Sequence, residues 1–537
     1  MHYHQIDGNV FVYFLWSSFF KDVRFALEKW DEILYNRISK VVSARTRSQQ
    51  QKNNGEKTMN ELFAAPDVNA HSINMFFEKC RQKNNDIHAM SIYINNEKKF
   101  SFSADPYSPY DRREIYSLSK SFTSAAIGAA WDEGLIDLDE KLTDIFPDKL
   151  PEKISENLGE MTVSHCLTMT TGHEACVMSA MAFSDDPARG FLQSEVGKKP
   201  GTYFVYNTGS SCMLGLILER KTGRRLFDYA YEKILEPLGI ADAYWTECAA
   251  PVNEGGIGLH ISCRDIEKFG LMLANGGVFN GKRILSQEWV DMACSAQVSS
   301  EENGDSGTGI WTSGYGFQFW QSAQGGYRGD GLKGQLCMVM PKYGAVVSIV
   351  ACTVNTEEEV IDAITLVEEL IGKNGEPLAP LCYAPLGTDK DVSAFTGKTA
   401  GIENNPIGIT TVRTEKTDTG IALTLLNGTR AQTLRAGNGR WETSELTFPC
   451  ITPKILFFMD ASKIETVRLA SSFTVEDGKL IIRMKHLSDP HTVTVTVEID
   501  NNAVTAAVKA ENFPEMLPES AGRLTGKIIG KTEINSK

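Results

Sequence analysis

A Pro- and Gly-rich segment in the C-terminal half of the chain, NGEPLAPLCYAPLGTDKD (374–391), separates two stretches with different hydrophobic patterns. After it, the chain consists of short apolar runs bounded by Asn, Asp and Gly. The run HTVTVTVEI (491–499) alternates Val or Ile with Thr or Glu, which is typical of a strand with one buried and one wet face. Residues 392–537 are therefore predicted to form an antiparallel β domain, a barrel or a sandwich, joined to the rest by a linker over 376–391.

The preceding part of the chain, 59–375, mixes helical and strand-like patterns and is predicted to be an α+β domain. Within 89–103, apolar runs flank NNEK and predict a hairpin. The segment CMVMPKYGAVVSIVACT (337–353) predicts two strands about a Pro-Lys-Tyr-Gly turn, and 357–372 predicts a closing helix. Its length gives this domain room for a large core.

The first 58 residues differ in composition from the rest of the chain. An aromatic-rich start leads into SARTRSQQQKNNGEKT, a polar segment with the composition of a disordered linker. We hypothesise that Met59 is the natural start and that 1–58 is an N-terminal extension that is not native. A genuine helix over 22–44 is the alternative.

Charge and cysteine content disfavour several classes of function. The formal net charge is −14, and the main body has no basic block, which argues against nucleic acid or an anionic membrane as a partner. The eleven cysteines include no C-x-x-C pair, and the nine histidines show no metal-ligand spacing. We therefore expect reduced thiols in a cytoplasmic protein, with no metal or organic cofactor. The apolar run 9–20 is too short to span a bilayer.

The stretch IYSLSKSF (115–122), followed by the small and apolar TSAAIGAAW, is the candidate for chemistry. Ser117 and Lys120 are three residues apart and share one face of the predicted helix 117–133. Burial and the positive end of the helix dipole both lower the pKa of Lys120 toward that of a general base. A serine needs such a base because its hydroxyl is a weak nucleophile. By itself, this spacing favours a Ser-rich helix start with a lysine that reaches solvent over a catalytic pair.

Further segments follow in an order that favours the catalytic interpretation, and together they resemble the serine β-lactamase-related hydrolases. This family includes class C β-lactamases, penicillin-binding proteins, esterases, D-amino-acid peptidases and 6-aminohexanoate-dimer hydrolases. The resemblance implies a β-lactamase/transpeptidase-like fold over 60–375, an antiparallel sheet flanked by helices with a helical subdomain. It is carried by IYSLSKSFTSAAIGAAWDEGLIDLDEKLTDIFP (115–147), MTVSHCLTMTTGHE (161–174), KPGTYFVYNTGSSCMLGLILERKTG (199–223) and GGIGLHISCRDIEKFGLMLANGGVFNGKRILS (255–286).

The resemblance implies roles for three residues. Ser117 would be the acylated nucleophile and Lys120 its proton acceptor. Tyr206 would shuttle protons between the nucleophile, the leaving group and the attacking water. A free phenol has a pKa of about 10, and the Lys120 ammonium is expected to lower the pKa of Tyr206. The family's Tyr-x-Asn motif is Tyr206-Asn207-Thr208 here. Asn207 and Thr208 are therefore predicted substrate contacts, with a Thr208 hydroxyl where the family has an amide.

A second departure concerns the family's Lys-Thr-Gly or His-x-Gly motif. Gly329-Asp330-Gly331 occupies this position and lacks the cation that would hold a substrate carboxylate. Arg328 or Lys333 would have to replace that cation. Asp330 favours a neutral or cationic substrate, although a plain turn aspartate is an equal alternative.

Two further groups of residues are expected near the pocket. The backbone N–H groups of Ser117 and of Leu332 would form an oxyanion hole. Trp311, Phe317 and Trp320 are expected to line the pocket or its rim.

These expectations favour a serine hydrolase that cleaves ester or amide bonds of small molecules through a Ser117 acyl-enzyme. A β-lactamase or D-amino-acid peptidase is the alternative within the family. A non-catalytic ligand-binding or sensor protein on the same fold is the alternative from another class. The expected partner is a small ester, amide or lactam, and a homo-oligomer is left open.

Overall fold

The computed structural model describes residues 61–528 apart from 183, 248–251, 301–309, 323–324, 373–375, 380, 382–383, 406–407, 428–429, 448–465 and 511–522. The predicted extension 1–58 lies outside the described residues, so its origin stays a hypothesis. The predicted linker 376–391 contains no helix or strand at its described positions. The domain boundaries taken from the sequence remain predictions.

The predicted α+β domain is built on an antiparallel sheet with the strand order β1-β3-β2-β12-β11-β10-β9. The predicted hairpin over 89–103 is confirmed as β2 and β3, and the predicted pair about the Pro-Lys-Tyr-Gly turn as β11 and β12. The strands are β1 (Leu62–Ala64), β2 (Asp86–Ile94), β3 (Glu97–Ser103), β9 (Trp320–Ser322), β10 (Gly326–Gly331), β11 (Gln335–Met340) and β12 (Ala345–Cys352).

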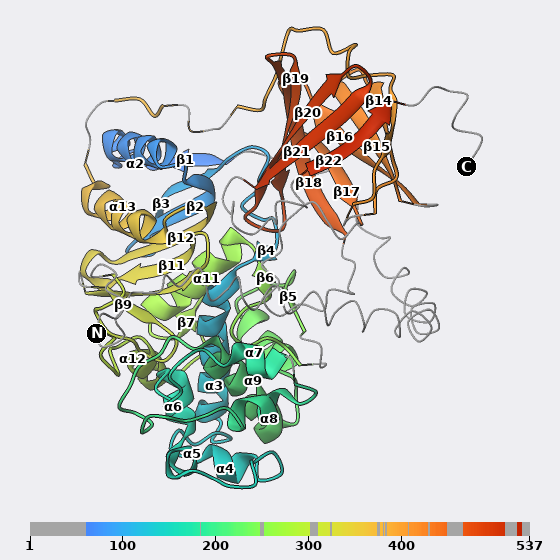
Figure 1. The fold of residues 1–537 in the computed structure, drawn as a ribbon. Coiled ribbons are helices and arrows are strands. Elements are labelled where there is room, and N and C mark those ends of the chain that lie inside the picture. Colours follow the sequence, from blue (N-terminus) through green and yellow to red (C-terminus); the bar gives the residue numbers. More distant parts are fainter. Residues whose placement is uncertain are drawn as a thin grey trace, which may run out of the picture. The chain divides into compact units, whose positions relative to one another are not determined.

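Both faces of this sheet are buried. On β11, Leu336 and Met338 face one hydrophobic cluster, and Cys337 and Val339 face the other. Such strands are continuous apolar runs because neither side meets water. Helices α2 (Ala70–Gln82) and α13 (Thr356–Glu369) cover one face, and α11 (Cys263–Ala274) packs on β11 and β12 from the other (Figure 1). Helix α13 confirms the predicted closing helix.

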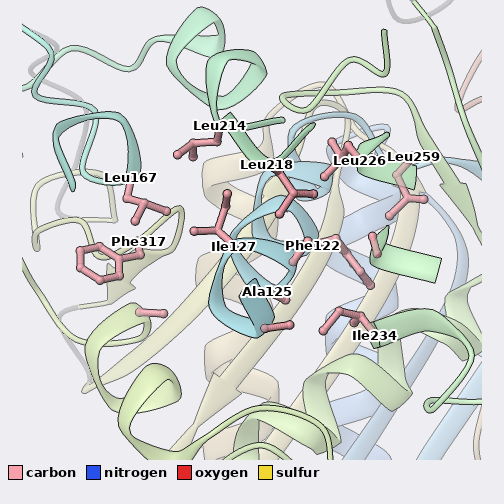
Figure 2. Packing of buried hydrophobic residues seen from close by; sticks show 14 of the residues in the cluster. Phe122, Ala125, Ile127, Leu167, Leu214, Leu218, Leu226, Ile234, Leu259 and Phe317 are labelled. Carbon is pink, nitrogen blue, oxygen red and sulfur yellow. The ribbon is translucent and has the colours of Figure 1, made fainter. Parts of the chain in front are cut away.

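Helix α3 (Ser119–Asp132) is the centre of the helical region. Its residues from Ser119 to Ala130 are all buried, which explains why the segment is small and apolar on every side. Phe122, Ala125 and Ile127 pack among Leu214, Leu218, Leu226 and Ile234 (Figure 2). The surrounding helices are α4 (Leu142–Ile145), α5 (Glu156–Glu160), α6 (Val163–Leu167), α7 (Met178–Ala182), α8 (Pro187–Leu192), α9 (Thr208–Thr222), α10 (Leu226–Ala230), the π-helical turn η2 (Tyr231–Leu235) and α12 (Gln287–Ala293).

Short elements connect these layers. A three-stranded sheet has the order β4-β6-β5, and β7 pairs with β8. The elements are β4 (Arg113–Glu114), β5 (Tyr244–Trp245), β6 (Leu259–Ile261), β7 (Val278–Phe279), β8 (Lys282–Arg283) and the 3-10 turns η1 (Tyr116–Leu118) and η4 (Pro341–Tyr343).

The C-terminal part is an antiparallel β-barrel, so the predicted β domain is confirmed and the barrel is the form it takes. Its ten strands follow the order β16-β15-β14-β13-β22-β21-β20-β19-β18-β17, and a pairing between β16 and β18 closes the sheet (Figure 1). The strands are β13 (Thr399–Ile402), β14 (Thr411–Lys416), β15 (Gly420–Asn427), β16 (Arg430–Gly437), β17 (Glu442–Leu446), β18 (Val467–Glu476), β19 (Lys479–His486), β20 (Thr492–Asp500), β21 (Ala503–Ala510) and β22 (Arg523–Ile528).

The fold class is thus the predicted α+β one with an added β domain. Among the described residues, no helix combines the length and the apolar character needed to cross a bilayer. A cytoplasmic location stays a prediction.

Candidate active site

Ser117 lies in the 3-10 turn η1, immediately before α3. The preceding residue, Tyr116, has a φ of 48°, a left-handed conformation that costs a non-glycine residue roughly 1–3 kcal/mol. This sharp turn directs the chain from β4 into η1. Ser117 stays partly exposed, while Leu118, Ser119 and Lys120 are buried. Among the serines of this stretch, Ser117 alone lines the pocket described below.

Lys120 is held against Ser117. Its Nζ donates hydrogen bonds to Ser117 Oγ at 2.9 Å and to the backbone carbonyl of Gly256 at 2.8 Å. The side chain is 1% exposed, and this burial lowers the pKa of Lys120 to about 8 because desolvation disfavours the ammonium. The prediction of a lowered pKa is confirmed. At pH 7 about a tenth of such lysines are neutral and able to accept the Ser117 proton.

Tyr206 completes the group. Tyr206 lines the same pocket as Ser117, and Lys120 Nζ lies 5.0 Å from the centre of the Tyr206 ring. The ring stacks on Trp320 with centroids 5.3 Å apart. The expectation that Lys120 lowers the pKa of Tyr206 is wrong. Burial, reinforced by the nearby Asp330 carboxylate, raises the pKa of Tyr206 well above its usual value. Tyr206 is therefore a proton donor at neutral pH.

The segment just before β6 supports this group, and no role had been predicted for it. The carbonyl of Gly255 accepts a hydrogen bond from Thr123 Oγ1, and that of Gly256 accepts one from Lys120. A side chain at Gly256 would collide with Thr208. Glycines are required at 255 and 256 because a side chain there would collide with α9, at Ser211 and Thr208, while the two carbonyls reach α3.

The glycines of β10 serve the same purpose on the other side of Ser117. A Cβ at Gly329 would collide with Leu118 and Ser121, and one at Gly331 would collide with the backbone carbonyl of Ile115. Strand β10 therefore packs against η1 with no space for a side chain at these two positions. This close packing brings Gly331 and Leu332 to the wall of the pocket that holds Ser117.

Substituting Gly331 with alanine is expected to lower kcat/KM by about 10²-fold, because a displacement of about 1 Å at the reacting centre costs that much. Overpacking is expected to destabilise the fold by about 1–3 kcal/mol. Gly159→Ala is the matched control, since its nearest neighbour would be 3.9 Å away. Steady-state ester hydrolysis and thermal unfolding measure the two effects. An unchanged kcat/KM in Gly331→Ala would show that the position of β10 is unimportant for rate.

Arg328 and Asp330 form a buried pair on β10. Arg328 Nε donates to Asp330 Oδ2 at 3.0 Å. The rest of the guanidinium donates to the carbonyl oxygens of Ile310 and Gln321 and to Ser322 Oγ. Arg328 is 0% exposed and does not line the pocket, so its charge is directed at Asp330. Burial raises the pKa of Asp330, and Arg328 opposes this effect.

The pocket beside Ser117 has a volume of about 590 Å³, within the range that holds small organic ligands. Its described lining includes two carboxylates, those of Glu174 and Asp330, and no lysine or arginine side chain. The lining residues are Ser117, Glu174, Tyr203, Phe204, Val205, Tyr206, Ser300, Trp311, Trp320, Asp330, Gly331, Leu332 and Thr356. The site thus combines an aromatic wall with two carboxylates, each of which is paired with a cation outside the lining.

Sequence reasoning placed some residues here and missed others. Trp311 and Trp320 line the pocket as expected, whereas Phe317 lies in the hydrophobic core, so that expectation is wrong. Glu174, Tyr203, Phe204, Val205 and Thr356 were missed, whereas Ser300 belongs to the loop 299–309 that was expected to edge the cleft. Tyr203 lies three residues before Tyr206 in the segment 199–223, which was the available signal, whereas Glu174 ends the separate segment 161–174 and its position there gave no such signal.

Asn207 and Thr208 are not among the lining residues. Asn207 is the N-cap of α9, and its Oδ1 accepts hydrogen bonds from the backbone N–H groups of Val177 and Gly209. Its buried Nδ2 has no hydrogen-bond partner among the described residues. Thr208 begins α9 and packs against Gly256. Substrate contacts by these two residues stay predictions.

No group of three or more His, Cys, Asp and Glu side chains in the described part of the chain is placed to hold a metal ion. The expectation of a reaction without metal or organic cofactor stays a prediction.

A β-lactamase family model matches residues 77–370. This is more than half of the chain, which therefore belongs to the β-lactamase family of serine hydrolases. The family resemblance drawn from the sequence is confirmed.

Named relatives within the family differ in activity. The 6-aminohexanoate-dimer hydrolase of Paenarthrobacter ureafaciens is 27% identical over 264 residues, covering 45% of this chain and 66% of that protein. The monacolin J acid methylbutanoyltransferase of Aspergillus terreus is 28% identical over 152 residues, covering 24% of this chain and 36% of that protein. The chain thus spans less than two thirds of each of these relatives. The octameric penicillin-binding protein homologue from Pyrococcus abyssi aligns over 85% of this chain and 99% of its own, with 17% identity and a TM-score of 0.46.

Proposed function

We propose that the chain is a serine hydrolase that cleaves ester or amide bonds of small molecules through an acyl-enzyme at Ser117. The observation that carries this proposal is the buried Lys120, with its lowered pKa, 2.9 Å from the Ser117 hydroxyl. A neutral amine at this place accepts the hydroxyl proton as Oγ attacks a carbonyl carbon.

The remaining groups fit the later steps. The N–H groups of Ser117 and Leu332, both residues of the pocket wall, would hold the oxyanion of the tetrahedral intermediate. Tyr206, kept as a phenol by its raised pKa, would donate its proton to the leaving group and recover one from the Lys120 ammonium. Water then attacks the acyl carbon, and its proton returns through the same pair as Ser117 is released.

The charge of the pocket narrows the substrate class. Asp330 and Glu174 are the charged side chains of the described lining, and their own partners, Arg328 and Lys198, lie outside it, so a substrate carboxylate would find no cation in the lining to pair with. Neutral or cationic esters and amides are favoured over β-lactams and peptides that are recognised through a carboxylate. An esterase or amidase is therefore favoured over a β-lactamase or D-amino-acid peptidase.

A fluorophosphonate probe tests the proposal directly. The expected result is one adduct per chain, located by mass spectrometry on the peptide that carries Ser117, and a burst of product from a p-nitrophenyl ester. A panel of a p-nitrophenyl ester, a D-amino-acid amide and nitrocefin then separates the subclasses. Absence of both adduct and burst would favour the ligand-binding or sensor alternative, and rapid nitrocefin turnover would favour a β-lactamase.

Asp330→Asn is expected to reduce the preference for a cationic substrate about tenfold. The measurement is the ratio of kcat/KM for the mono-p-nitrophenyl esters of trans-4-aminocyclohexanecarboxylate and trans-cyclohexane-1,4-dicarboxylate, which differ in charge at similar size and cannot cyclise. Glu174→Gln is the control for the other carboxylate, which is half-exposed and paired with Lys198 at 3.0 Å.

Because Asp330→Asn leaves the buried Arg328 charge unpaired, it can cost about 3–5 kcal/mol of stability. The double variant Arg328→Met/Asp330→Asn removes both charges and keeps the test usable. A ratio that is unchanged in folded protein of both variants would contradict a role of Asp330 in substrate choice.

A further inference from the structure

The interior of the C-terminal β-barrel contains a second cavity, separate from the Ser117 pocket. Its volume is about 150 Å³, comparable to protein cavities of roughly 150 Å³ that stay dry and bind benzene. Its lining is almost entirely aliphatic. A barrel of this size either fills its interior with side chains or encloses a ligand.

Three neighbouring strands show how the lining arises. Because side chains alternate across a strand, β19, β20 and β21 each turn every second residue inward. The register aligns these residues across the sheet, with Ile482 opposite Val495 and Val495 opposite Val508. Two residues further along β20, Val497 lies opposite Ala506 of β21. All five line the cavity, and the small side chain of Ala506 leaves part of the volume open.

Several inward side chains of this barrel remain accessible. Val495, Val497, Ile499 and Val508 are only partly buried although they pack on the barrel's hydrophobic cluster. Apolar side chains that face inward and yet keep accessible surface gain free energy when a hydrocarbon covers them.

One charged side chain belongs to the lining, that of Lys398. It lies directly before β13 and next to Thr414, whose Oγ1 accepts a hydrogen bond from the Lys398 backbone N–H at 3.3 Å. The Lys398 side chain is half-buried and forms no ion pair with the described residues. A cation beside an aliphatic cavity is complementary to an amphiphile with an anionic head.

We propose that the barrel binds a medium-chain aliphatic carboxylate, with the hydrocarbon chain inside the cavity and the carboxylate at Lys398. The size of the cavity matches a hydrocarbon of about six carbons, so octanoate is a suitable probe. Each methylene added between butanoate and octanoate is expected to strengthen binding roughly fourfold, and the gain ends when the cavity is full. This site is independent of the proposed reaction at Ser117.

Adjacent alanines on β21 provide a matched pair of variants. Ala506 lines the cavity, whereas Ala507 is exposed on the outer face. In the full chain, Ala506→Phe is expected to abolish octanoate binding measured by isothermal titration calorimetry, and Ala507→Phe to leave it unchanged. Thermal unfolding verifies that both variants fold. Equal octanoate affinity in both variants would overturn the proposal, because the bound chain would then lie elsewhere, for example in the Ser117 pocket.

The Lys398→Met variant tests whether Lys398 binds the carboxylate head group of the ligand. Octanoate is expected to lose about threefold to fivefold in affinity, as for a partly exposed ion pair, while octanol binding stays the same. An equal loss for both ligands would overturn the assignment of the carboxylate to Lys398. A further test is whether the protein sediments with phosphatidylglycerol vesicles. If it does, and Ala506→Phe abolishes this sedimentation, the ligand is a membrane lipid and the proposal of a free carboxylate is overturned.

Discussion

Ser117→Ala is expected to lower kcat/KM for a p-nitrophenyl ester by about 10⁴–10⁶-fold, the range found when a serine nucleophile is removed from a hydrolase. The Ser117 hydroxyl is partly exposed, lines the 590 Å³ pocket together with Tyr206 and contacts Lys120. Alanine keeps the backbone and its N–H group, so substrate binding and the oxyanion hole survive. The loss is therefore expected in kcat, with little change in KM.

The neighbouring serines are the controls for this experiment. Ser119 Oγ accepts a hydrogen bond from the Leu259 N–H at 3.1 Å, and Ser121 Oγ donates one to the Gln318 carbonyl at 3.0 Å. Both are buried, so their alanine variants each lose about 1–3 kcal/mol of stability and keep the nucleophile. Fluorophosphonate labelling is expected in Ser119→Ala and Ser121→Ala and not in Ser117→Ala. Labelling of Ser117→Ala at an unchanged rate would show that another residue is acylated.

The layered fold could be predicted because it depends on patterns that are local in the sequence. The alternation in 491–499 predicted a strand with one solvent-exposed face. Strand β20 has this form, and its Val495 and Val497 point into the interior of the barrel. The apolar pair β11 and β12 was predicted from continuous runs about a turn. Closure of the barrel, in contrast, depends on a pairing between β16 and β18, and no local pattern specifies which strands meet.

The lowered pKa of Lys120 could also be predicted from a local pattern. Lys120 is part of a small, apolar helix segment, and burial of that segment lowers the pKa of the lysine. The pKa of Tyr206 was not predictable in this way. Its rise comes from burial under Trp320 and from Asp330, which lie far away in sequence. Likewise, Gly329-Asp330-Gly331 was interpreted only from the absence of the cation that the family has at this position. Its glycines also have a steric role against Leu118 and Ile115, which only the packing of β10 on η1 makes visible.

Lys120→Met is expected to lower kcat/KM by about 10²–10⁴-fold, the usual contribution of a general base. Methionine keeps the length and apolar character of the side chain and removes the amine. Loss of the 2.8 Å hydrogen bond to the Gly256 carbonyl costs about 1–3 kcal/mol of stability, which thermal unfolding measures separately from the rate.

The dependence of rate on pH distinguishes a base from a structural lysine. Only neutral Lys120 accepts the Ser117 proton, and burial lowers its pKa to about 8. In the wild type, kcat/KM is therefore expected to rise about tenfold per pH unit below that pKa and to level off above it. The Lys120→Met variant is expected to lack this rise, because the amine whose lowered pKa causes it has been removed. A variant that is slower at every pH and keeps the same rise would contradict the assignment, since the titrating group would then be one other than Lys120.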